Sequence, residues 1–392
     1  MNLERNKGLF ITFLALLGAT PPLSTDMYLA AIPQIAKDWG VGTDLVNLTL
    51  VLWFASFSVF ILVAGSLSDK YGRKPVLLGG LVLFVLSSLM CFISQNVSQL
   101  IVFRILQGMG AAAPSAIVMA IIRDKYTGRE RQQAIAYVMT IVAVAPMVAP
   151  IIGAMLLQFA GWRFIFMCQA VMVLISLIIS FSFQESIAEK LDVTLAKLVS
   201  RYMVHFRNRD FMFASISMGF LLLPFYGFIA FSPIYYIKIN GLSEKMFSLF
   251  FGVNALSFMA GSYSSARIVK FLSDKKMITF SVMGCILAGA GLAAFSGIHY
   301  LYFMFSMILY SYCTGVSRPV SGALILGLVA TDVGSASSFL VFYQFIGGAF
   351  SMAFVTYDWA HPVMVFGLLA LIVPSVVLLL WSRIAGMLNP IH

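Results

Sequence analysis

Residues 51–90 decide the fold of this chain, and they have the sequence VLWFASFSVFILVAGSLSDKYGRKPVLLGGLVLFVLSSLM. Two apolar runs, at 45–67 and 75–93, flank a short polar break that carries residues of both charges. A helix needs about 20 apolar residues to cross the hydrocarbon core of a bilayer. Each run is therefore long enough to form a membrane-spanning helix, and the break is a turn between the two helices.

The same pattern continues along the whole chain. Of its 392 residues, 61% are hydrophobic and only 10% are charged, whereas a soluble globular protein carries about 25% charged residues. We therefore predict an all-α integral membrane protein whose surface is completed by lipid. Twelve spans are expected, with these approximate limits: 8–33, 45–67, 75–93, 98–122, 132–157, 162–183, 211–238, 244–270, 276–297, 300–328, 334–358 and 361–382.

The placement of the basic residues predicts the topology. With both ends of the chain in the cytoplasm, nineteen of the 25 Lys and Arg residues fall in inner segments and four in outer segments. The remaining two, Arg104 and Arg318, lie within spans. Cytoplasmic loops of membrane proteins carry such an excess of basic residues. The net charge of +10 is thus a topology signal, and no nucleic-acid partner is expected.

The longest polar stretch divides the spans into two sets of six. We expect an N-terminal half at 1–183, a cytoplasmic linker at 184–210 and a C-terminal half at 211–392. The linker segment DVTLAKLVSRYMVHF could form a surface helix. The four cysteines all lie inside apolar runs, which predicts buried thiols rather than disulfides or metal ligands.

Three segments of the first half combine glycine, proline and charge at helix ends. The first inner loop is Gly65-Ser-Leu-Ser-Asp69-Lys-Tyr-Gly72-Arg73-Lys74, where Gly65 would allow close helix approach and Gly72 a tight turn. The fourth span contains Arg104-Ile-Leu-Gln107-Gly108 and ends in Arg123-Asp124. The fifth contains Pro146-Met-Val-Ala-Pro150-Ile-Ile-Gly153, where prolines and small residues would bend and closely pack the helix.

These segments resemble the signature loop, the second motif and the antiporter motif of the major facilitator superfamily. The helix-one segment Ser24-Thr25-Asp26-Met27-Tyr28-Leu29 is similar to the bicyclomycin-resistance (Bcr/CflA) branch of its drug:proton antiporters. The resemblance implies the major facilitator fold in a bacterial cytoplasmic (inner) membrane. It also implies a gating latch in which Arg73 pairs with Asp69 and Asp124. The sequence departs from the branch at Ala30, Ser265 and Arg318-Pro319, which leaves the substrate open.

Asp26 is the one acidic residue that we expect well inside a span. A carboxyl in the bilayer is costly and marks a functional site by default, so Asp26 is a candidate proton carrier. The alternative is a structural acid near the outer surface. Arg104 enters the membrane from the same side, and we expect it to lie close enough to Asp26 to bias proton binding. Alternatively, Arg104 bonds carbonyls of helix one.

Arg318 falls near the middle of the tenth span. Ser311, Gly315 and Gly322 share its helical face, which predicts a polar and roomy wall. A permanent cation there would attract a carboxylate and repel cationic drugs. The alternative is that Arg318 pairs with Asp26 or with carbonyls of a broken seventh span. Other candidates for the substrate cavity are Tyr28, Gln107, Ser115, Tyr226, Asn254, Tyr310 and Thr314.

The resemblance and Asp26 together indicate a proton-coupled antiporter that exports drugs or metabolites by alternating access. A dedicated exporter of an anionic metabolite such as a siderophore is one alternative, and a proton-coupled importer is another. No enzyme activity is expected, because the sequence lacks phosphate-binding glycine loops and metal-ligand spacings. We expect no cofactor, since the proton gradient drives transport. The expected partners are a small molecule, protons and the lipid bilayer, and the chain is expected to be monomeric.

Overall fold

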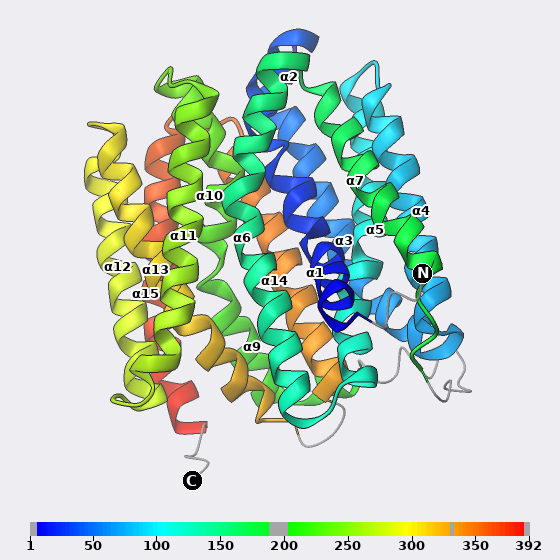
Figure 1. Ribbon diagram of the computed structural model, residues 1–392. Helices are drawn as coiled ribbons and strands as arrows, with labels where there is room; N and C mark the ends of the chain where they lie inside the picture. Colours follow the sequence, from blue (N-terminus) through cyan, green and yellow to red (C-terminus); the bar gives the residue numbers. More distant parts are fainter. Residues whose placement is uncertain (1–5, 188–202, 330–332, 388–392) are drawn as a thin grey trace. The chain divides into compact units, whose positions relative to one another are not determined.

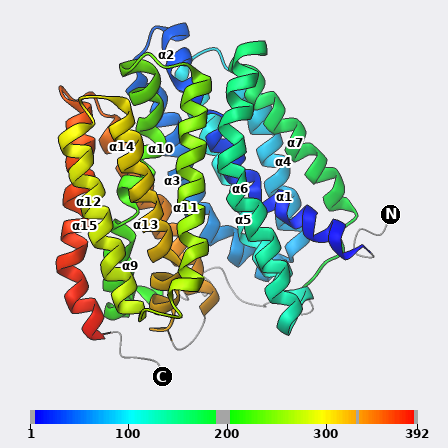
Figure 2. The same cartoon turned by 60° about the vertical axis from the view of Figure 1, so that its left-hand side comes forward.

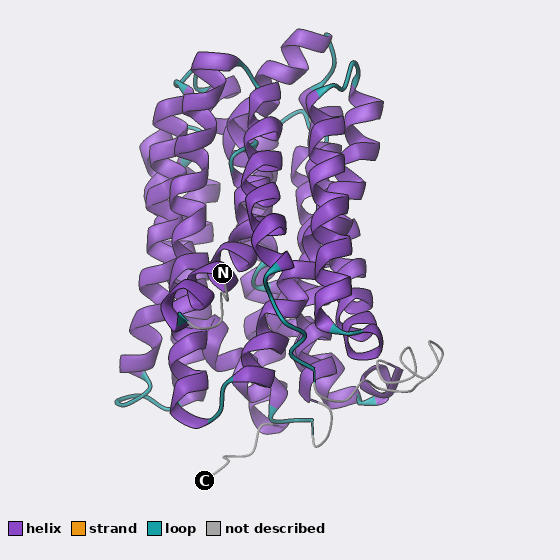
Figure 3. Ribbon diagram, turned by 45° about the vertical axis from the view of Figure 1, so that its right-hand side comes forward, coloured by secondary structure: helices purple, strands orange, loops and turns teal. Residues whose placement is uncertain are grey.

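A computed structural model of the chain describes residues 6–187, 203–329 and 333–387, and the elements in these ranges are helices, without strands (Figure 3). The predicted all-α architecture is therefore confirmed. The chain divides into two compact units, Met1–Leu198 and Val199–His392. Most of the segment expected to form a surface helix lies outside the described residues.

The first unit contains six spans, of which the first is interrupted (Figure 1). Its elements are α1 (Lys7–Asp26), η2 (Leu29–Ala31), α2 (Ile32–Trp39), α3 (Thr43–Tyr71), α4 (Arg73–Phe92), α5 (Val97–Lys125), α6 (Gly128–Ala160) and α7 (Arg163–Phe181).

The second unit begins with another interrupted span (Figure 2). Its elements are α9 (Arg209–Phe220), α10 (Leu223–Pro233), the π-helical turn η3 (Ile234–Ile239), α11 (Glu244–Ile268), α12 (Asp274–Phe295), α13 (Tyr300–Leu326), α14 (Val333–Thr356) and α15 (Pro362–Met387).

The two units repeat one packing plan. In the first unit α3 packs on α5, α4 packs on α5 and α7, and α1 packs on α6. In the second unit α11 packs on α13, α12 packs on α13 and α15, and α10 packs on α14. Figures 1 and 2 both show α12 and α15 side by side. The same order of neighbours in each set of six spans is the expected consequence of a parallel repeat.

Eleven helices in the described part of the chain are long and apolar enough to cross a membrane. The twelfth span, α13, has a comparable length of 27 residues and contains Arg318 and Pro319. The very short breaks expected near 297–300 and 358–361 are confirmed between α12 and α13 and between α14 and α15.

Several helices are longer than the apolar runs that predicted them, whereas α7, α11, α13 and α14 are slightly shorter. The second span was expected at 45–67 and occupies Thr43–Tyr71. The first was expected to end near residue 33 and reaches Trp39 after its interruption. Hydropathy marks where the bilayer ends, whereas backbone hydrogen bonding continues these longer helices into the polar boundary.

Small residues allow α11 and α13 to approach closely. A Cβ at Gly261 would lie 2.2 Å from the carbonyl oxygen of Tyr312, and one at Gly315 would lie 2.2 Å from that of Phe258. The roomy wall expected around Arg318 is therefore wrong at Gly315, which is packed against the neighbouring backbone. At Gly322 the expectation holds, because an added Cβ would meet nothing within 4 Å.

Candidate functional site

Asp26 lies at the point where the first span is interrupted. It is the last residue of α1, and the chain turns at Met27 and Tyr28 before η2 and α2 resume the span. Pro33 is the second residue of α2, and proline cannot donate the backbone hydrogen bond that a continuous helix would need there. The carboxyl group is buried, with 5% of the residue exposed. It accepts a hydrogen bond of 2.8 Å from the hydroxyl of Thr25.

The interruption is packed against the Pro146–Gly153 segment of α6. A Cβ built on Gly153 would lie 2.0 Å from the carbonyl oxygen of Met27 and 2.7 Å from its carbonyl carbon. Pro150, one turn earlier, is buried, and Pro146 is half-buried. Only glycine permits this approach, so the motif predicted to pack closely does so beside Asp26.

Gly153→Ala is expected to lower the free energy of unfolding by roughly 1–3 kcal/mol, the usual effect of overpacking a tight contact. The added methyl group would meet backbone atoms, which cannot rotate away. Urea unfolding of the purified protein in mixed micelles measures the change. Gly79→Ala is the matched control, because a Cβ at Gly79 meets nothing within 4 Å. Equal stability of the two variants would show that the close approach is not rigid.

Arg104 organises a buried polar network that joins four helices of the first unit. Its guanidinium donates to the carbonyl oxygen of Ser24 at 3.3 Å and to the side-chain oxygen of Gln107. Gln107 in turn donates to Ser88 at 2.7 Å and to Gln169 at 3.0 Å. Gln169 closes the network by donating to the Ser24 carbonyl at 3.1 Å.

Three aromatic rings surround the Arg104 guanidinium. Their centroids lie 4.8 Å away for Tyr28, 5.7 Å for Trp53 and 5.8 Å for Phe166. Such contacts favour a desolvated cation. The Nε and Nη2 atoms of Arg104 are buried and have no hydrogen-bond partner.

The described residues include no ion pair between Arg104 and Asp26. Arg104 instead binds the helix-one carbonyl of Ser24, which is the alternative left open by the sequence. Tyr28 and Gln107, both predicted to line the cavity, are fully buried in the same surroundings. The hydroxyl of Tyr28 hydrogen-bonds that of Thr49 at 2.9 Å.

The predicted latch residues meet at the junction of α3 and α4. Arg73 lies 2.6 Å from a carboxylate oxygen of Asp69 and 3.0 Å from one of Asp124, and only 3% of its side chain is exposed. Gly72 alone joins the two helices, with φ of 110°, a conformation that suits glycine. The close approach predicted at Gly65 is absent here, because an added Cβ would meet nothing within 4 Å.

Glu185 completes the latch from the end of the sixth span. Its carboxylate accepts the backbone N–H groups of Arg73 at 2.9 Å and Lys74 at 3.1 Å, the first two residues of α4. Partial burial alone would raise the pKa of Glu185. Four backbone N–H donors together lower it by more than burial raises it, so the net pKa lies below its ordinary value. A carboxylate at a helix N-terminus also satisfies donors that the helix leaves free.

In the second unit, the seventh span is broken between α9 and α10, at Leu221 and Leu222. The carbonyl oxygen of Leu221 accepts a hydrogen bond of 3.1 Å from the hydroxyl of Tyr310. That of Leu223 accepts one of 2.6 Å from the hydroxyl of Ser351. Neutral side chains therefore bind the carbonyls that had been considered as partners for Arg318.

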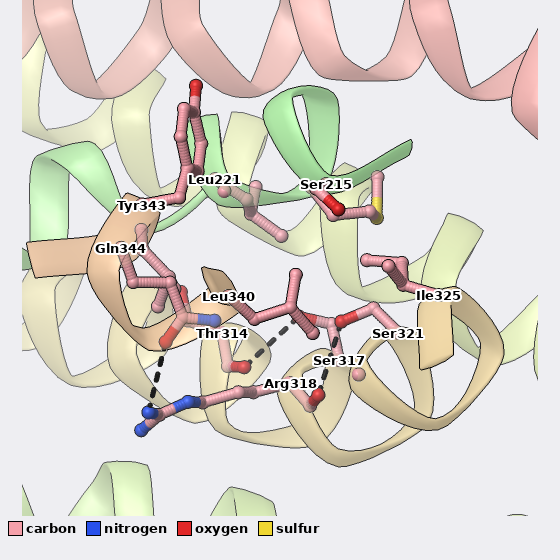
Figure 4. Close-up of a pocket in the computed structure, with 14 residues that line it drawn as sticks. Ser215, Leu221, Thr314, Ser317, Arg318, Ser321, Ile325, Leu340, Tyr343 and Gln344 are labelled. Carbon is pink, nitrogen blue, oxygen red and sulfur yellow. Dashed lines mark hydrogen bonds between the residues drawn. The ribbon is translucent and has the colours of Figure 1, made fainter. Parts of the chain in front are cut away.

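A small pocket lies beside this break and is lined by α9, α13 and α14 (Figure 4). Arg318 is exposed, and its guanidinium lies 3.3 Å from the side-chain oxygen of Gln344. The Phe258 ring lies 5.8 Å away. Thr314 also lines the pocket. Of the residues predicted for the cavity, these two share one site.

The other predicted cavity residues have different surroundings. Asn254 is buried and accepts a hydrogen bond of 2.7 Å from Ser311, so it joins α11 to α13. Tyr226 is buried against Gly348, where a Cβ would lie 2.7 Å from its ring. Ser115 is half-buried on α5. None of the three lines the Arg318 pocket.

The sequence interpretation missed three residues that complete these sites. Glu185 follows directly after the sixth span, on the same predicted side as the latch loop. Gln169 is the one carboxamide in that span, and polar residues within spans are rare enough to mark a site. Ser215 lines the Arg318 pocket and gives no sequence signal, because serine occurs in every predicted span except the fifth.

Comparison with known families and proteins identifies the family of the chain. The family model described as Major Facilitator Superfamily matches residues 10–352. The "Uncharacterized MFS-type transporter YdgK" of Bacillus subtilis is 33% identical over 83% of this chain and 82% of its own. The "Bicyclomycin resistance protein homolog" of Haemophilus influenzae is 26% identical over 74% and 73%. The "Multidrug resistance protein MdtL" of Klebsiella pneumoniae is 26% identical over 84% and 83%.

Solved structures of transporters share the fold at low sequence identity. The peptide transporter POT in complex with alafosfalin has a TM-score of 0.78 and 13% identity, over 97% of this chain and 96% of its own. A bacterial homologue of the human lysosomal transporter Spinster, inward-facing and occupied, has a TM-score of 0.76 and 14% identity, over 98% and 99%.

Proposed function

Because the chain belongs to the Major Facilitator Superfamily, we propose that it is a proton-coupled antiporter that exports small organic molecules. The observation that carries the proposal is Asp26, a buried carboxyl at a helix interruption. A carboxyl group can take up a proton on one side of the membrane and release it on the other. A helix interruption lets the two parts of the span move separately, as in discontinuous helices of other transporters.

Two further observations support export. Gly153 of the antiporter motif lies against the backbone directly after Asp26, so movement of α6 and access to the carboxyl are mechanically linked. Relatives of the chain carry the names bicyclomycin resistance and multidrug resistance protein. All the relatives reported above are named as transport or resistance proteins, which fits a chain that is a transporter rather than an enzyme.

The excess of basic residues in alternate loops supports a cytoplasmic-membrane location with both chain ends in the cytoplasm. In this orientation the latch of Asp69, Arg73, Asp124 and Glu185 lies at the inner surface. Each unit has its own core of six spans, so we propose that a single chain is the working transporter and needs only the proton gradient as its energy source.

Transport of radiolabelled bicyclomycin into proteoliposomes tests the proposal, since one relative is named for resistance to this compound. An antiporter accumulates its substrate in liposomes with an acidic interior, because outward proton flow drives inward substrate flow. A protonophore should abolish this accumulation. Accumulation only when the outside is acidic would establish a proton-coupled importer. Accumulation of equal size with and without a pH gradient would rule out proton coupling.

A further inference from the structure

The pocket beside the break in the seventh span has an unusual chemical character for a membrane interior. Its enclosed space is about 20 Å³, which accommodates about one water-sized group. Most of the polar side chains around it come from α13 and α14, and Ser215 of α9 lies opposite them (Figure 4). The pocket therefore suits one polar group of a larger molecule, with the rest of that molecule outside.

Arg318 has unused binding capacity. A guanidinium carries five N–H donors, and the structure shows one hydrogen bond from it, to Gln344. Among the described residues, no carboxylate forms an ion pair with Arg318. The nearby helix-break carbonyls already accept hydrogen bonds from Tyr310 and Ser351. A permanent charge in a membrane span, with no counter-charge among the described residues, points to a ligand.

Ser215 forms the wall of the pocket opposite Arg318 (Figure 4). It is 2% exposed, and its hydroxyl oxygen has no hydrogen-bond partner. Buried polar groups in proteins nearly always have one. Ser215 lines the same pocket as Arg318, but its oxygen has almost no exposed surface and lies away from the guanidinium (Figure 4), so a group bound at Arg318 does not reach it.

We propose that this pocket binds the carboxylate group of an anionic organic substrate. The inference rests on the proposed export function and names its substrate class. The planar guanidinium matches the two oxygens of a carboxylate. The apolar body of the substrate extends from the pocket. A cationic compound is disfavoured at this site because its charge would face that of Arg318.

Equilibrium binding to the purified full-length protein in nanodiscs tests the proposal without a proton gradient, so it is independent of the transport assay. Three matched pairs serve as probes: benzoate and benzamide, 2-naphthoate and 2-naphthamide, and anthracene-9-carboxylate and its amide. We expect at least one carboxylate to bind roughly tenfold or more tightly than its amide, as for hydrogen bonds to charged groups. If no carboxylate binds more tightly than its amide, the proposal is wrong.

Variants assign the preference to the pocket. Arg318→Gln should abolish it, and Arg318→Lys should retain part of it. Arg267→Gln is the control, because Arg267 belongs to the same unit and lies 4.8 Å from the Tyr263 ring but does not line the pocket. A preference that survives Arg318→Gln would overturn the assignment. If chloride displaces the carboxylates and the carboxylates bind no more tightly than their amides, the pocket is a site for an inorganic anion instead.

Ser215→Ala separates a role in binding from a role in folding. Removing a buried hydroxyl without a partner should leave the melting temperature of the free protein unchanged or raise it. Carboxylate affinity should stay unchanged, because the Ser215 hydroxyl does not reach a group bound at Arg318. A loss of carboxylate affinity as large as that in Arg318→Gln would contradict the assignment of binding to Arg318.

Discussion

Asp26→Asn should reduce substrate accumulation driven by a pH gradient to the level of protein-free liposomes. The amide has nearly the same size as the carboxyl, and its oxygen can still accept the hydrogen bond from Thr25. It cannot take up or release a proton in the accessible pH range, so transport can no longer be coupled to proton flow. Exchange of labelled for unlabelled substrate without a gradient should persist. Proteoliposome assays under both conditions measure the difference.

Asp38→Asn is the matched control for this experiment. Asp38 belongs to the same interrupted span, in α2, but it is exposed and accepts a hydrogen bond of 3.1 Å from Trp162. This variant should retain gradient-driven accumulation. Accumulation that persists in Asp26→Asn would remove the carboxyl from the coupling mechanism and leave Asp26 as a structural acid of the helix interruption.

The fold could be predicted from the sequence because lipid imposes a simple requirement on each span. Apolar runs of sufficient length must be helical, since no water can satisfy the backbone there. The run at 75–93 accordingly appears as α4, Arg73–Phe92. Interruptions were harder to predict. The break after Asp26 changes no hydropathy, because Met27 and Leu29 are as apolar as the helix on either side.

The sites were predictable where charge and sequence neighbourhood coincide. Asp69 and Arg73 meet as expected, since one helical turn and a short loop separate them, whereas Asp124 was expected there only from the family resemblance. The partner of Arg104 was not predictable, because a choice between the Asp26 carboxylate and the Ser24 carbonyl depends on how the two helices are rotated. Glu185 was missed for a similar reason: its role depends on the backbone of α4 rather than on another side chain.

Replacing Arg73 with Gln should destabilise the protein by about 3–5 kcal/mol, the usual cost of removing one partner from a buried ion pair. The guanidinium lies between two carboxylates, and without it Asp69 and Asp124 would repel each other in a partly buried setting. Gln is too short to replace both contacts and carries no charge. Unfolding in mixed micelles, monitored by tryptophan fluorescence, measures the loss of stability.

Arg123→Gln is the control for this effect. Arg123 lies 3.8 Å from the same Asp124, but 55% of its side chain is exposed. Exposed ion pairs contribute about 0–1 kcal/mol, so the change should be small. Combining Arg73→Gln with Asp69→Asn and Asp124→Asn should restore part of the stability, because the repulsion disappears with the charges. If the triple variant is no more stable than Arg73→Gln alone, the cost arises from lost packing of the arginine side chain, and the latch does not depend on charge.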